Sequence, residues 1–173
     1  MRKTAALIGY SKQIEDFLDL LFEKELFAYC VNAYIYYYGF SQEEIYNFIA
    51  ENGMLPLCNR FGETLPLCDK LERLSHCHFN DVMSRGGLFN LIQQCAYICG
   101  IEDCCASSLR KTWAYNELCK GTDYSIIKRN FSYKGSLMGF FEYLSIDVEH
   151  INKNENLKKL YSRASRYNIA LSE

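Results

Sequence analysis

The sequence predicts a mainly α-helical protein with a small β-hairpin or sheet, and three observations support that prediction. Apolar residues recur every three or four positions along most of the chain, which is the spacing of a helix face. Glycines follow several of these stretches, where a helix end favours a left-handed residue. Both prolines, Pro56 and Pro66, fall in one segment that lacks the helical spacing.

The first part of the chain, residues 11–53, is expected to be helical. Gly39 and Gly53 each follow an apolar stretch and are expected to end a helix. Ser41 stands three residues before Glu44, which is the pattern of a capping box. The expected helices cover residues 11–26, 28–38 and 41–52.

A short β region is expected over residues 54–68. This segment contains the prolines and a turn around Asn59–Gly62 between two short apolar runs. We expect a hairpin here.

Six further helices are expected, with Ser84 as an N-cap, Gly121 as a stop and a helix start near Asp123. Two of them are joined only by Gly121–Thr122, which resembles a helix-turn-helix. The last is polar with a narrow apolar stripe, and the tail 148–173 is expected to dock on its own domain or on a neighbour. The expected helices cover residues 69–77, 85–99, 107–120, 123–131, 134–146 and 147–167.

Composition points to one domain spanning residues 1–173. Hydrophobic residues make up 49% of the 173, which is enough for a core, and no apolar run is long enough to cross a bilayer. Residues 1–13 lack the apolar region and cleavage site of a secretion signal. We therefore expect a cytoplasmic protein with no membrane contact.

Nine cysteines form no C-x-x-C pair, and we interpret them as reduced, mostly buried thiols. The alternative is a metal site made by ligands from two segments. Its spacing is unlike that of zinc sites, so no metal and no cofactor are expected. The candidate ligands are His76, Cys77 and His78 with Cys95, Cys99, Cys104 or Cys105.

Charge divides unevenly between the two parts of the chain. Residues 1–107 hold 8 Lys and Arg against 14 Asp and Glu, whereas residues 108–173 hold 11 against 7. The basic second part suits a local anion-binding face, and the alternative is an ordinary solvated helical surface.

Arg110 and Lys111 stand side by side in the first turn expected for the helix 107–120. A helix N-terminus favours a phosphate, and a guanidinium can hold two phosphate oxygens. Tyr143 follows 33 residues later, and its hydroxyl would be able to attack a phosphodiester that Arg110 stabilises. The alternatives are an ion pair or helix-bridging contact for Arg110 and core packing for Tyr143.

Residues 84–147 read SRGGLFNLIQQCAYICGIEDCCASSLRKTWAYNELCKGTDYSIIKRNF, and later FFEYLSID. This order of elements resembles the C-terminal part of the tyrosine recombinase (phage integrase) catalytic domain. The stretch YYYGFSQEEIYNF and the stretch CNRFGETLPL resemble earlier segments of that family more faintly. The resemblance implies a truncated catalytic-domain-like fold without the N-terminal core-binding domain that clamps DNA.

The resemblance also implies which catalytic groups are missing. Ser41 stands in the place of the family's first Arg, Ser107 in the place of its first His, and Tyr133 in the place of the second. The family's catalytic Lys has no match other than Arg60. Arg110 and Tyr143 are kept as vestiges, with Tyr143 one residue later than usual.

Because neither Tyr nor Ser replaces an imidazole near pH 7, we expect no catalysis. The expected function is that of a DNA-binding regulator, repressor-like or modulating recombination, encoded on a phage or mobile element. The residues expected to contact DNA are Arg110, Lys111, Lys128, Arg129 and Lys134.

Two alternatives stay open. In the first, the chain is an interaction module that contacts no DNA. Through the residues after Tyr143 it assembles with or inhibits an active recombinase or another partner, or binds a second copy. In the second, it retains DNA strand cleavage through Tyr143.

Overall fold

A computed structural model describes residues 4–172, with side chains described for residues 4–165. Helices dominate this part of the chain, as the sequence predicts, and none of them is long and apolar enough to cross a membrane. They are α1 (Ser11–Lys24), α2 (Leu26–Tyr38), α3 (Gln42–Asn52), α4 (Asp69–Leu74), α5 (Arg85–Ile98), α6 (Ala106–Lys120), α7 (Tyr124–Asn130), α8 (Leu137–Tyr143), α9 (Val148–Asn152) and α10 (Glu155–Ser172).

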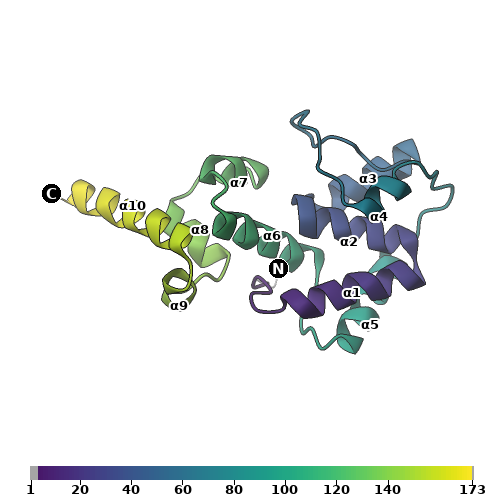
Figure 1. The fold of residues 1–173 in the computed structure, drawn as a ribbon, viewed down its shortest axis with the longest axis horizontal. Helices are drawn as coiled ribbons and strands as arrows, with labels where there is room; N and C mark the ends of the chain where they lie inside the picture. The colour runs from purple at the N-terminus through teal and green to yellow at the C-terminus, as the bar shows by residue number, and fades with distance from the viewer. Residues whose placement is uncertain (1–3, 173) are drawn as a thin grey trace.

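The helices form two lobes that share α6. Figure 1 shows α1–α5, the first lobe, on one side of α6 and α7–α10, the second lobe, on the other, with α10 projecting at the C-terminal end. Leu109 near the start of α6 belongs to the core of the first lobe, whereas Trp113 and Leu118 belong to the core of the second. One helix therefore contributes to both cores.

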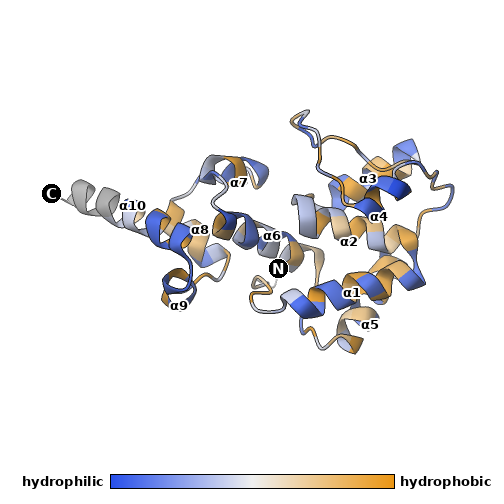
Figure 2. Cartoon of the chain, viewed as in Figure 1, coloured by the Kyte–Doolittle hydropathy of each residue, from blue (hydrophilic) through white to orange (hydrophobic). Residues whose placement is uncertain are grey.

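The first lobe is built around α2. Ten of the thirteen residues in this helix are buried, which matches its apolar character on all sides. Figure 2 shows apolar residues concentrated in the first lobe and mainly polar residues along the coloured part of α10. Tyr34 is fully buried and donates its hydroxyl proton to the carbonyl oxygen of Pro56 at 2.7 Å, so α2 also fixes the segment after α3.

Gly39 sets how closely α6 approaches the end of α2. Its φ is +74°, and a Cβ built on it would lie 2.5 Å from the Trp113 ring. The αL conformation and the close ring both require glycine here. The predicted stop at Gly39 is confirmed, and so are the stop at Gly53 and the Ser41 cap, whose hydroxyl accepts a hydrogen bond from the Glu44 amide at 3.1 Å.

The β region differs from the prediction. Within residues 4–172 the expected hairpin is reduced to one isolated antiparallel bridge between Cys58 and Thr64, and no strand or sheet forms. Pro56 and Pro66 lie just outside this bridge, and each lacks the N–H that would extend a ladder.

The predicted polar helix over 147–167 was wrong in its continuity. The structure divides it into α9 and α10, with the break at residues 153–154. Asn154 causes the break because its side-chain oxygen accepts hydrogen bonds from the amides of Asn156 and Leu157 and so starts a new helix.

Candidate nucleic-acid interface

Arg110 lies in the second turn of α6, because the helix begins at Ala106 rather than at the serines. Its Nε donates to the carbonyl oxygen of Gly39 at 3.0 Å. Its Nη2 donates to both the carbonyl oxygen and Oδ1 of Asn130, each at 2.7 Å. Arg110 therefore joins the C-terminal ends of α2 and α7, whose carbonyl groups carry partial negative charge.

Arg60 brings a second guanidinium to the same point. Its Nη2 donates to the carbonyl oxygen of Asn130 at 2.6 Å and to that of Arg129 at 3.2 Å. Two cations thus share one carbonyl oxygen. Burial lowers the pKa of Arg110, and the neighbouring charge of Arg60 lowers it further, while Glu44 and Tyr143 act in the opposite direction.

Arg129 completes what we call the arginine cluster, made of Arg60, Arg110 and Arg129. Its guanidinium carbon lies 3.9 Å from the centre of the Phe61 ring, and that of Arg60 lies 4.9 Å from the same centre. Its Nη2 also donates to Oε1 of Glu63 at 2.6 Å. Two guanidinium groups are therefore held against one exposed aromatic ring.

The turn that the β-bridge between Cys58 and Thr64 encloses positions Arg60 and Phe61. Oδ1 of Asn59 accepts hydrogen bonds from the amides of Phe61, at 2.9 Å, and Glu63, at 3.0 Å. Gly62 has a φ of +78°, which closes the turn. Hydrogen bonds from Asn59 and Arg129 lower the pKa of Glu63, so this carboxylate stays ionised beside Arg129.

Tyr143 reaches the cluster through Phe131. The guanidinium carbon of Arg110 lies 4.5 Å from the centre of the Phe131 ring, and the rings of Phe131 and Tyr143 are 6.2 Å apart. Lys111 places its Nζ 4.2 Å from the centre of the Tyr143 ring. The Tyr143 residue is 45% exposed, so it lies at the surface beside the cluster rather than inside the core.

The three positions where the resemblance implies lost catalytic groups have structural contacts. Ser41 caps α3, and Ser107 is exposed and accepts a hydrogen bond from Oγ1 of Thr4 at 3.2 Å. Tyr133 donates to the carbonyl oxygen of Ser136 at 3.0 Å and packs on Phe140. None of these side chains is a proton shuttle near neutral pH.

The imidazoles of the chain are engaged in other parts of the fold. His78 bonds to Oδ1 of Asn80, and His150 caps α9 and packs against Tyr115. His76 lines a surface recess with Met54.

Among the residues predicted to contact DNA, Lys111 differs from the others in its burial. Lys111 is only 4% exposed and donates to the carbonyl oxygen of Thr4, so it does not face solvent. The cause is tertiary: the segment before α1 runs across this face of α6, which helical spacing alone does not reveal. Lys128 is half-buried, and Arg129 and Lys134 are exposed.

Sequence reasoning underestimated Arg60 and did not identify Asn130. The signal for Arg60 was its place in the turn. Asn130 acts through its backbone carbonyl oxygen, which accepts hydrogen bonds from two arginines, and no sequence pattern indicates such a role. Among the described residues, no group of three His, Cys, Asp or Glu side chains is placed to hold a metal ion.

Comparisons of the chain with protein families, curated proteins and solved structures found no match.

Proposed function

We propose that this chain is a non-catalytic DNA-binding protein of the tyrosine recombinase type, acting as a regulator for a phage or mobile element. The observation that carries the proposal is the pair of guanidinium groups of Arg60 and Arg110, which meet at one carbonyl oxygen of Asn130. Like charges held this closely favour a bound anion. The Arg110 hydrogen bonds use Nε and Nη2 and leave Nη1 without one among the described residues.

The segments that meet around Arg110 and Phe131 support the proposed relation to the tyrosine recombinases. The end of α2, the turn at residues 59–62, the first turns of α6, the end of α7 and Tyr143 of α8 all surround Arg110 or Phe131. They carry Arg60, Arg110 and Tyr143, which the resemblance matches to catalytic positions. The other matched positions, Ser41, Ser107 and Tyr133, make contacts elsewhere.

A binding role without catalysis follows from the side chains present. Phosphoryl transfer depends on charge stabilisation and on positioned proton donors and acceptors. The arginine cluster can stabilise charge. Ser41, Ser107 and Tyr133 do not provide the proton donors and acceptors. Phosphate contacts that only position DNA need no proton transfer.

The test is the affinity for mixed-sequence duplex DNA, measured by fluorescence anisotropy over a range of salt concentrations. Arg60→Gln should weaken binding and lower the slope of log Kd against log salt by about one. Arg73→Gln is the matched control, because Arg73 is exposed on α4 and its side chain makes no hydrogen bond or ion pair in the described structure. Equal behaviour of the two variants contradicts the proposal.

A second candidate function is an interaction module, and one observation favours it. Phe89, Tyr97 and Ile98 are exposed on α5, with Tyr97 85% exposed. Exposed apolar side chains on one helix are typical of a partner surface. This function requires that the wild-type chain does not bind DNA even at low salt and that Tyr97→Ser abolishes capture of the partner.

A further inference from the structure

Residues 4–7, which we call the strap, cross one face of α6 at its N-terminal end. The carbonyl oxygen of Thr4 accepts a hydrogen bond from Nζ of Lys111, and Oγ1 of Thr4 donates to Oγ of Ser107 at 3.2 Å. The amide of Leu7 donates to Oγ1 of Thr112 at 2.7 Å. These hydrogen bonds connect the strap to Ser107, Lys111 and Thr112 of α6.

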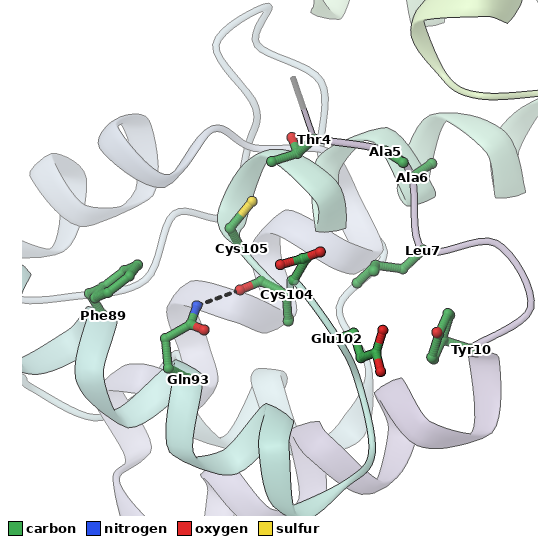
Figure 3. A pocket seen from close by; sticks show the side chains of 11 residues that line it. Thr4, Ala5, Ala6, Leu7, Tyr10, Phe89, Gln93, Glu102, Cys104 and Cys105 are labelled. Atoms are coloured by element: carbon green, nitrogen blue, oxygen red, sulfur yellow. Dashed lines mark hydrogen bonds between the residues drawn. The ribbon is translucent and has the colours of Figure 1, made fainter. Parts of the chain in front are cut away.

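Apart from these hydrogen bonds, Leu7 anchors the strap in the hydrophobic core of the first lobe. Figure 3 shows Thr4, Ala5 and Ala6 along one wall of a pocket of about 580 Å³, opposite Phe89 and Gln93 of α5. On another side, Thr4 and Ala5 line a recess of about 320 Å³ together with Lys111 and Tyr143. Of the four strap residues only Leu7 is buried. Thr4 and Ala6 are half-buried and Ala5 is exposed, so we expect residues 4–6 to open at a lower free-energy cost than the Leu7 anchor.

The strap covers a cation that adjoins the arginine cluster. Lys111 follows Arg110 directly in α6, and the Tyr143 ring lies close to both Lys111 and Phe131. A neutral carbonyl is a weaker partner for an ammonium group than a phosphate is, because charge-assisted hydrogen bonds are stronger. Glu142 also lines the recess, so an entering phosphate meets one carboxylate there.

We propose that the strap is a removable cover, and that a DNA phosphate takes the place of the Thr4 carbonyl on Lys111 when the strap lifts. This rests on the proposed DNA-binding function and adds to it a regulated contact. In the covered state the cluster binds DNA without Lys111, and in the uncovered state Lys111 extends the cationic surface past Tyr143.

Lysine acetylation of the full chain without DNA, followed by mass spectrometry, tests the cover by itself. Leu7→Ala weakens the buried anchor without changing charge and should speed modification of Lys111 at least severalfold, while Lys12 and Lys134 react as in wild type. Leu57→Ala, the same change at an exposed position, should leave all three rates unchanged.

A second variant guards against general unfolding. Thr112→Val removes the acceptor of the Leu7 amide and should give the same selective increase at Lys111. If both variants leave the Lys111 rate at the wild-type value, or raise all lysine rates together, the cover does not exist and the proposal is overturned.

DNA binding tests the second half of the proposal. Leu7→Ala should steepen the slope of log Kd against log salt by about one, and the double variant Leu7→Ala/Lys111→Met should lose that gain. An unchanged slope in Leu7→Ala, with Lys111 uncovered, overturns the phosphate contact. Failure of the proposed function itself is recognised separately, because Arg60→Gln then leaves DNA binding unchanged.

Discussion

Arg110 and Lys111 are neighbours in α6, yet their surroundings differ in kind. The Arg110 side makes three hydrogen bonds to two helix ends and stands beside two further arginines. The Lys111 side is covered by the strap and is almost fully buried. Two adjacent charges in one helix turn can therefore have different roles, which depend on what packs over each. Arg110 serves as a brace for the fold, and Lys111 serves as a covered contact.

The largest expected effect comes from a substitution at Gly39, whose carbonyl oxygen accepts a hydrogen bond from Arg110. Gly39→Ala would place a Cβ 2.5 Å from the Trp113 ring at a φ of +74°. We expect the free energy of unfolding to fall by about 3 kcal/mol. Gly62→Ala is the control, because its φ is +78° but nothing lies within 4 Å, and it should cost about 1 kcal/mol. Urea unfolding measures both, and equal losses would contradict the close contact with Trp113.

Arg110→Met tests the brace from the other end. It removes three hydrogen bonds and leaves the carbonyl groups of Gly39 and Asn130 with fewer partners. We expect a loss of about 2 kcal/mol in the free energy of unfolding. Arg73→Met should change stability by less than about 0.5 kcal/mol. If Arg110→Met leaves the free energy of unfolding unchanged, Arg110 is not a structural brace.

Glu63→Gln tests whether the arginine cluster binds DNA. The carboxylate pairs with Arg129 at 2.6 Å and competes with a phosphate for that guanidinium. We expect DNA affinity at low salt to rise about threefold. Glu51→Gln changes the net charge equally at an exposed site on α3 and should have a smaller effect. If the two variants have equal effects, net charge rather than the freed Arg129 explains the gain.

The smallest expected effect concerns Tyr143. Since no imidazole stands beside it in the contacts described, wild-type protein should trap no covalent adduct on a nicked suicide substrate. Tyr143→Phe should then change DNA affinity by less than about twofold. An adduct that forms with wild type and disappears in Tyr143→Phe would establish the strand-cleaving alternative.

Local signals in the sequence were enough for most helices and their caps. Ser41, Gly39 and Gly53 act through neighbouring backbone groups, so their effects are visible in a short window. The division at Asn154 was missed because Asn fits both a polar helix face and an N-cap. The β region was overestimated because a turn between two short apolar runs was interpreted as a hairpin, whereas the structure forms only one bridge there.

The candidate site was predictable only in part. Arg110 was identified from its place near a helix start, but its partners are Gly39, 71 residues earlier in the chain, and Asn130, 20 residues later. Burial of Lys111 depends on the strap, which lies over a hundred residues earlier in the chain. Contacts of such long range come from the tertiary fold, which local periodicity does not encode.

Because Leu109 and Trp113 of α6 lie in different cores, neither lobe ends where the other begins. Heating should therefore melt the chain in one cooperative transition, and limited proteolysis should release no stable half. A cut within α6 would disrupt the hydrophobic cores of both lobes at once.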